Sequence, residues 1–197
     1  MSKVTAKLDP ARAQFQLKVT LLDIRPAIWR RLLVPAAIKL PKLHAVLQIA
    51  FGWTNSHLHA FRIGDEAYET YYPESWEDPL GNGERHDESK FRLCHLLHAK
   101  GDRLIYEYDF GDSWQHDVRV EKILPSERST PVTCVAGARA APPEDCGSIP
   151  GYQELIEAMS DPRHPERERL LEWLGEPYDP LAFDLDAIDT HLKLRKF

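Results

Sequence analysis

The sequence lacks a long hydrophobic run, and it lacks the glycine-rich motifs that mark common nucleotide sites. No window contains the ~18 or more consecutive apolar residues that a membrane helix needs. Residues 1–12 are polar and have no apolar centre of the kind found in a secretory signal. We therefore expect a cytoplasmic protein that does not engage a membrane. The absence of GxGxxG, GxSxG and Walker sequences leaves no local signal for a dinucleotide site, an α/β-hydrolase or a P-loop enzyme.

Cysteine is scarce. Cys94, Cys134 and Cys146 form an odd set without a CxxC pair. Free thiols in a reducing compartment are the simplest interpretation. Cys134 and Cys146 lie twelve residues apart in a Pro- and Gly-containing segment, and burial as small apolar side chains is favoured over metal binding or a disulfide. No base is recognisable beside them, which disfavours a nucleophilic cysteine.

Charge is unevenly distributed along the chain, although the composition is 43% hydrophobic and 28% charged, as in a globular protein. Residues 1–48 hold nine Lys and Arg against two Asp, a net of +7, within a chain of net charge −6. A basic face binds phosphate backbones through counterion release. The candidate nucleic-acid contacts are Arg25, Arg30, Arg31, Lys39 and Lys42. The favoured alternative is that this segment folds against the acidic remainder and neutralises it.

Periodicity predicts a sheet followed by helices. Alternating apolar and polar residues predict strands at 15–22, 28–34, 57–63, 102–108 and 114–124, with a return strand near 67–68. Pro41 opens a helix whose apolar face carries Leu43, Val46, Leu47 and Ala50, and Gly52 ends it. Helices are also predicted near 152–159, 165–174 and 185–194, the last with Asp184 as its N-cap.

Two segments are expected to be irregular: 71–90 and 125–150, the second rich in proline. The stretch from 91 to 99 is expected to form a short strand or helical turn. Strands first and helices last predict an α+β fold: a mostly antiparallel sheet covered by helices, in one domain with a helical C-terminal part. Residues 1–12 are expected to be a flexible arm, and residues 13–197 the domain.

The densest candidate site is the run from Tyr106 to His116. It places Glu107, Asp109, Asp112 and His116 in or beside one hairpin turn. Carboxylate oxygens and imidazole nitrogens are usual ligands of Zn²⁺, Mn²⁺ and Fe²⁺. The alternative is architectural, because Asp and Gly also stabilise hairpin turns.

His57-Leu58-His59 is the second candidate, because residues i and i+2 of a strand share a face. A strand HxH is a weak metal signal by itself, and a structural role is the alternative. Glu144-Asp145 is a solvated acidic turn, or a loop that brings carboxylates to the hairpin. The candidate metal ligands are His57, His59, Asp112 and His116. The candidate catalytic residues are Asp109, Asp112, His116, Glu144 and Asp145.

Several motifs together resemble one known family. They are Ile28-Trp29-Arg30-Arg31, Gly52-Trp53 with Ser56-His57-Leu58-His59-Phe61, the run 106–116, the segment from Cys134 to Tyr152, and Tyr178-Asp179-Pro180 with Phe183-Asp184. Over residues 13–195 the chain resembles the plasmid pRiA4b Orf-three-like family. One departure is Cys146-Gly147-Ser148, where the family pattern suggests Gly-Gly.

The resemblance implies a small α+β domain linked to mobile elements, whose members are described as passenger or resolvase-like proteins. A serine resolvase needs a nucleophilic Ser among arginines and a helix-turn-helix, and neither is recognisable here. The first hypothesis is therefore a binding module for nucleic acid or a protein partner. The alternative is a metal-dependent hydrolase or nuclease-like enzyme that uses a divalent transition metal and the Asp109/Asp112/His116 hairpin. A third hypothesis makes that hairpin purely architectural.

Overall fold

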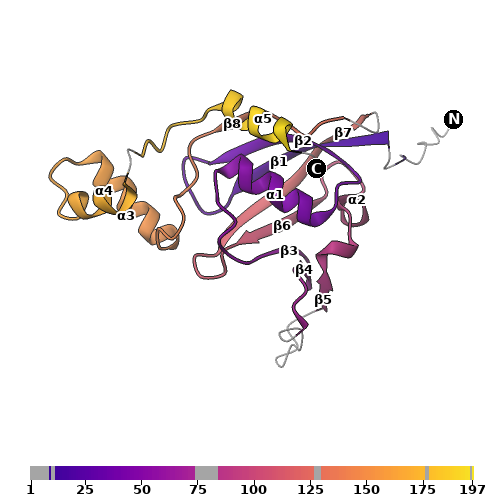
Figure 1. Cartoon of the computed structure of the whole chain (residues 1–197), viewed down its shortest axis with the longest axis horizontal. Helices are drawn as coiled ribbons and strands as arrows, with labels where there is room; N and C mark the ends of the chain where they lie inside the picture. Colours follow the sequence, from indigo (N-terminus) through magenta and orange to yellow (C-terminus); the bar gives the residue numbers. More distant parts are fainter. Residues whose placement is uncertain (1–8, 10–11, 74–83, 127–129, 176–177, 196) are drawn as a thin grey trace.

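A computed structural model describes residue 9 and residues 12–73, 84–126, 130–175, 178–195 and 197 (Figure 1). Its centre is an eight-stranded sheet with the order β5-β4-β3-β6-β7-β1-β2-β8. Neighbouring strands are antiparallel except for the parallel pair β4–β5 at one edge. The strands are β1 Ala13–Leu21, β2 Trp29–Pro35, β3 His59–Ile63, β4 Glu66–Glu69, β5 Glu84–Asp87, β6 Arg103–Tyr108, β7 Trp114–Pro125 and β8 Thr133–Ala138.

The helices are α1 Leu40–Phe51, α2 Leu93–Leu96, α3 Ser148–Ser160, α4 Arg167–Leu174 and α5 Leu185–Leu194, and a 3₁₀ turn, η3, spans Glu88–Lys90. In Figure 1, α1 lies across the sheet, while α3 and α4 lie to one side of it. Helix α5 contacts both α1 and β8. The predicted α+β fold, with a mostly antiparallel sheet, is confirmed. No helix among the described residues is long and apolar enough to cross a membrane.

Helix α1 closes the core over the sheet. Leu43, Val46, Leu47 and Ala50 are fully buried, and burial of each Leu or Val contributes about 1.5–3 kcal/mol. Pro41 lies in the first turn, where its missing N–H costs no hydrogen bond. Gly52 ends the helix with φ 78°, a left-handed conformation that suits glycine. The predicted helix is therefore confirmed at both ends.

Two strands were not predicted, and both lie in segments expected to be irregular. β5 has the sequence Glu-Arg-His-Asp, which contains no apolar residue. It is the edge strand of the sheet and pairs with β4. β8 is built largely from small residues and pairs with β2. Most of the predicted N-terminal arm, residues 1–8 and 10–11, lies outside the described residues.

The layer between α1 and the sheet contains a polar network. Leu104, Tyr106 and Tyr108 alternate on the buried face of β6, and His44 and Gln48 project from α1 toward them. The Tyr106 hydroxyl lies 2.8 Å from His44 Nδ1 and accepts a hydrogen bond from Gln48 Nε2 at 3.1 Å. This network positions the loop that follows α1, from which the candidate site is built.

Candidate functional site

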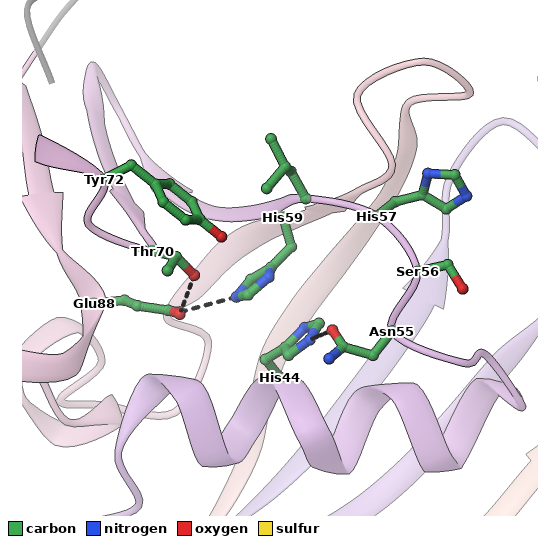
Figure 2. Close-up of a pocket in the computed structure, with 9 residues that line it drawn as sticks. His44, Asn55, Ser56, His57, His59, Thr70, Tyr72 and Glu88 are labelled. Atoms are coloured by element: carbon green, nitrogen blue, oxygen red, sulfur yellow. Dashed lines mark hydrogen bonds and ion pairs between the residues drawn. The ribbon is translucent and has the colours of Figure 1, made fainter. Parts of the chain in front are cut away.

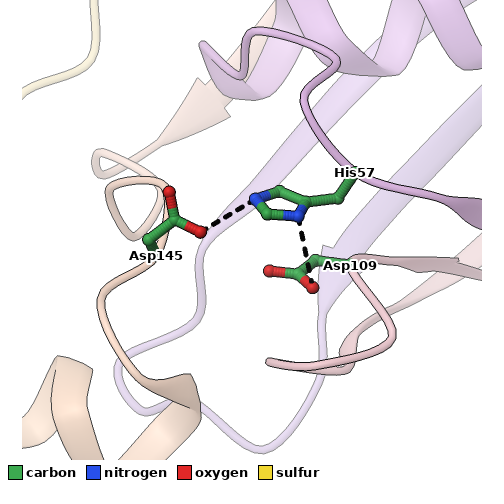
Figure 3. A group of neighbouring side chains, drawn as sticks. All are labelled: His57, Asp109 and Asp145. Atoms are coloured by element: carbon green, nitrogen blue, oxygen red, sulfur yellow. Dashed lines mark ion pairs between the residues drawn. The ribbon is translucent and has the colours of Figure 1, made fainter.

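Three carboxylates surround one imidazole at the end of β6, and we call this group the His57 cluster: His57, Asp109, Glu144 and Asp145. His57 Nε2 lies 2.9 Å from Asp145 Oδ1 and 3.9 Å from Glu144 Oε2. His57 Nδ1 lies 3.7 Å from Asp109 Oδ1 on the other side of the ring. Figure 3 shows the imidazole between Asp109 and Asp145, which come from segments far apart in the sequence.

Asp109 is held in place by the hairpin that follows β6. Its backbone has φ 57°, and its N–H donates to the Leu58 carbonyl at 2.9 Å. Its Oδ1 accepts the Gly111 N–H at 2.9 Å, which closes an Asx turn. The hairpin thus directs a buried carboxylate at His57 and simultaneously ties the β6–β7 turn to the loop before β3.

Glu144 is also fixed, by groups that donate hydrogen bonds to it. The Thr54 N–H donates to Oε1 at 2.7 Å, and the Tyr108 hydroxyl donates to the same oxygen at 3.0 Å. Burial, followed by this hydrogen bond to Glu144, raises the pKa of Tyr108 above its ordinary value, so Tyr108 stays protonated. Asp145, the next residue, has a side chain that is 67% exposed, and it leaves the cluster open to solvent.

The charge of the His57 cluster is unbalanced. Asp109, Glu144 and Asp145 form ion pairs only with His57 among the described residues, so no Lys or Arg offsets the three carboxylates there. His57 Nε2 is shielded from solvent yet forms no aligned hydrogen bond with the described residues, although Asp145 lies close. One imidazole nitrogen with carboxylate oxygens is a donor set suited to Zn²⁺, Mn²⁺ or Fe²⁺. The ligand atoms of His57, Asp109 and Asp145 all lie within 4.8 Å of one another.

A polar cavity of about 480 Å³ adjoins the cluster, and we call it the histidine pocket. It is lined by His44, Asn55, Ser56, His57, Leu58, His59, Thr70, Tyr72 and Glu88 (Figure 2). His57 is one of the lining residues and also belongs to the His57 cluster, and its ring points away from His59 and Glu88 (Figure 2).

Two histidines stack at the base of the pocket. The rings of His44 and His59 are parallel within 4°, with centroids 3.6 Å apart. Burial, together with the neighbouring His59, lowers the pKa of His44 to about 4, so that ring is neutral at pH 7. His59 Nε2 lies 2.9 Å from the buried Glu88 carboxylate, whose other oxygen accepts from the Thr70 hydroxyl at 3.1 Å.

The four predicted metal ligands do not converge. His57 faces the carboxylates of its cluster, whereas His59 faces Glu88 (Figures 2 and 3). His116 is fully buried against Phe51 and Trp53. Burial lowers the pKa of His116 to about 3, and its Nδ1 lies 3.2 Å from the Tyr106 carbonyl oxygen. His116 is therefore a neutral core residue and lies outside the cluster.

Asp112 also turns away from the other candidates. Its carboxylate accepts the Gly147 N–H at 3.2 Å, and its carbonyl accepts from the Ser148 hydroxyl at 2.8 Å. These bonds attach the β6–β7 hairpin to the start of α3, which is an architectural role. Of the predicted catalytic residues, Asp109, Glu144 and Asp145 come together, and Asp112 and His116 do not join them.

The predicted nucleic-acid residues are dispersed. Arg30 is buried and donates to the carbonyls of Ala50, Trp29 and Ala138, and burial lowers its pKa to about 10. Arg31 forms two hydrogen bonds with Glu121, at 2.6 and 3.0 Å. Arg25 is exposed at the turn between β1 and β2. Lys39 and Lys42 line a separate cleft of about 450 Å³.

Sequence reasoning missed His44 and Glu88. The apolar stripe of α1 offered a signal for the first, because His44 and Gln48 share the buried face with Leu40 and Leu47. Glu88 gave no such signal, since it lies in a segment expected to be a loop. The three cysteines are free, and burial raises the pKa of Cys146 to about 12, so its thiol stays protonated.

Comparisons with known proteins agree with the resemblance in the motifs. The chain is 36% identical over 176 residues to "Uncharacterized protein y4hQ" of Sinorhizobium fredii (strain NBRC 101917 / NGR234), with 88% of each covered. Its fold matches the crystal structure of "Protein of Unknown Function MM3350" from Methanosarcina mazei Go1, with a TM-score of 0.77 and 35% identity. That match covers 88% of this chain and 96% of the other. The model of the family described as "Plasmid pRiA4b ORF-3-like protein" matches residues 13–187, and the chain belongs to this family.

Proposed function

We propose that the protein is a metal-dependent hydrolase whose divalent cation binds at the His57 cluster and whose substrate occupies the histidine pocket. The observation that carries this proposal is the unbalanced charge: three carboxylates face one imidazole, and no Lys or Arg among the described residues pairs with them. Bringing like charges together is costly unless a cation compensates them.

The roles within the cluster follow from its contacts. His57 Nε2 and Asp145, 2.9 Å apart, are the proposed ligands together with Glu144. Asp109 lies on the Nδ1 side of His57, where a carboxylate orients a metal-binding imidazole and increases its basicity. A divalent cation at this position lowers the pKa of a bound water and polarises a substrate carbonyl or phosphoryl oxygen.

The hydrogen bonds of Glu144 support this assignment, because a ligand must be held before the cation arrives. Thr54 and Tyr108 fix its carboxylate from two directions, and Ser56 donates to the Tyr108 hydroxyl at 3.0 Å. The exposed side chain of Asp145 leaves the cation accessible from solvent. The cluster thus combines a preorganised side with an open side, as hydrolytic metal sites do.

The test is elemental analysis by plasma mass spectrometry of untagged protein after loading with Zn²⁺ or Mn²⁺. We expect close to one equivalent of metal in the natural protein and its loss in a folded His57→Ala variant. His98→Ala is the matched control, since His98 is an exposed histidine outside the cluster and should retain the metal. A protein that stays metal-free after loading, or a His57→Ala variant that keeps its metal, would overturn the proposal.

A nucleic-acid-binding role is the second candidate, and one observation favours it. Lys39, Lys42 and Arg92 line the same cleft and form no ion pair with an acidic side chain in the described part of the chain. Unpaired cations attract phosphate groups. Retention of DNA or RNA that weakens with salt and is lost in Lys39→Gln/Lys42→Gln would support this role. No binding at low salt would exclude it.

A further inference from the structure

The hydrogen-bonding groups of the histidine pocket are fixed by a network beneath it. Gln48 Nε2 donates to the Tyr106 hydroxyl at 3.1 Å, and burial holds the pKa of Tyr106 well above its usual range. Tyr106 therefore keeps its single proton and donates it to His44 Nδ1, 2.8 Å away. The other ring nitrogen of His44 then carries the proton and donates to Asn55 Oδ1 at 2.6 Å.

The network determines what Asn55 presents to the pocket. Its side-chain oxygen is committed to His44, and its backbone N–H donates to Gln48 Oε1 at 2.7 Å. The amide nitrogen makes no hydrogen bond with the described residues, so Asn55 offers two N–H donors. Asn55 also has φ 59°, a conformation that asparagine tolerates better than most residues and that is common at functional sites.

His59 presents a complementary group. Because the Glu88 carboxylate only accepts, His59 Nε2 carries the proton in their 2.9 Å hydrogen bond. His59 Nδ1 makes no hydrogen bond with the described residues, so this ring nitrogen is free to hydrogen-bond with a ligand. Stacking on His44 fixes the plane of the ring. The pocket thus holds a free ring nitrogen on His59 and N–H donors on Asn55, both beside His44.

The charge of the pocket selects among ligands. None of the described residues that line it is Lys or Arg, and Glu88 is a buried carboxylate. Asp109, Glu144 and Asp145 lie near His57, which also lines the pocket. Anionic ligands are therefore repelled and find no cationic side chain to compensate.

We propose that the histidine pocket binds an uncharged carboxamide. Asn55 donates to the carbonyl oxygen of the ligand, and the amide group of the ligand hydrogen-bonds with His59 Nδ1. That the carboxamide is a substrate rests on the proposed hydrolase function. Binding of the carboxamide in the pocket does not require the metal. In the hydrolysis, water adds to the amide carbon, the C–N bond breaks, and the departing nitrogen takes a proton from that water, giving a carboxylic acid and an amine.

The test compares benzamide with benzoate, which share a shape and differ in charge. The full-length protein is treated with EDTA, and binding is measured by calorimetry and by the NMR shifts of the histidine ring C–H groups. We expect saturable binding of benzamide with shifts at His44 and His59, and at least tenfold weaker binding of benzoate.

The Asn55→Gly variant should bind benzamide about tenfold more weakly, because it loses the donor while its positive φ suits glycine. Asp23→Gly is the matched control: Asp23 also has φ 59°, lies in the β1–β2 turn, and should leave binding unchanged. Equal or tighter binding of benzoate, no binding of benzamide, or unchanged affinity in Asn55→Gly would overturn the proposal.

Because the measurement is made without metal, the two proposals fail separately. If the protein binds benzamide but takes up no metal, the carboxamide-binding pocket is supported and the hydrolase proposal is excluded. If the protein binds metal but its metal-free form does not bind benzamide, the hydrolase proposal stands and the carboxamide proposal is excluded.

Discussion

Two buried neutral histidines make the fold sensitive to acid. Burial lowers the pKa of His116 to about 3, and burial with the neighbouring His59 lowers that of His44 to about 4. An unfolded histidine has a pKa of about 6.5. The unfolded chain therefore binds more protons than the folded chain below that value. Above pH 6.5 the two histidines do not reduce the free energy of unfolding. As the pH falls below 6.5 that free energy decreases, until His44 is protonated in the folded chain near pH 4 and His116 near pH 3.

The magnitude follows from the linkage between proton binding and stability. Near pH 5 both histidines are protonated in the unfolded chain and largely neutral in the folded one. The free energy of unfolding should then fall by about 2.5 kcal/mol per pH unit, about half from each residue. Between pH 7 and pH 5 the expected loss is about 4 kcal/mol. That loss is a large share of the roughly 5–15 kcal/mol typical of a folded domain.

The assay is urea unfolding at pH 7, 6 and 5, with the natural protein and a His116→Leu variant. Leucine has a similar size and cannot be protonated, so the variant should lose only about half as much stability between pH 7 and pH 5. His98→Leu, at an exposed position, should keep the full dependence. A natural protein with stability independent of pH over this range, or an equal loss in His116→Leu, would show that the buried neutral histidines do not cause the acid sensitivity.

Two further substitutions test the packing around the site. Arg30→Leu leaves the carbonyls of Ala50 and Ala138 without their donor. It should lower the free energy of unfolding in urea by about 2–4 kcal/mol, whereas replacing an exposed arginine that binds nucleic acid would change that free energy very little. Gly151→Ala should destabilise by about 3 kcal/mol, because its Cβ would lie 1.9 Å from the Cys146 carbonyl oxygen; a variant as stable as the natural protein by thermal unfolding would show that α3 shifts freely.

The sequence predicted the sheet well where one strand face is buried. Alternation locates β1, β2, β6 and β7, and Pro41 with Gly52 brackets α1. β5 and β8 were not predicted, because neither shows apolar alternation. β5 is an edge strand of charged and polar residues, and β8 consists largely of small residues. Pairing with a neighbouring strand, rather than local preference, makes these segments extended.

The misplaced site residues had signals in the same alternation. Trp114, His116, Val118 and Val120 share the buried face of β7, so the strand that placed His116 near the hairpin also placed it in the core. Arg30 likewise alternates inward on β2, between Trp29 and Arg31. Burial, rather than residue type, decides that these side chains do not form part of an exposed site.

Part of the His57 cluster was anticipated as a group, because Glu144-Asp145 was one candidate for a loop that brings carboxylates to the hairpin containing Asp109. His57, Asp109, Glu144 and Asp145 were each singled out from local patterns. Three loops bring these side chains together: one before β3, one after β6 and one before α3. Such long-range convergence has no periodic trace in one sequence, and the pairing of His59 with Glu88 is hidden for the same reason.

The metal site is tested by calorimetric titration of the metal-free protein with Zn²⁺, compared between Asp145→Asn and Asp112→Asn. The two variants make the same chemical change at neighbouring loops, but only Asp145 faces His57, since Asp112 accepts from Gly147. We expect one Zn²⁺ site per chain, at least tenfold weaker binding in Asp145→Asn, and unchanged affinity in Asp112→Asn. Absence of a stoichiometric site, or equal weakening in both variants, would contradict the proposed metal site.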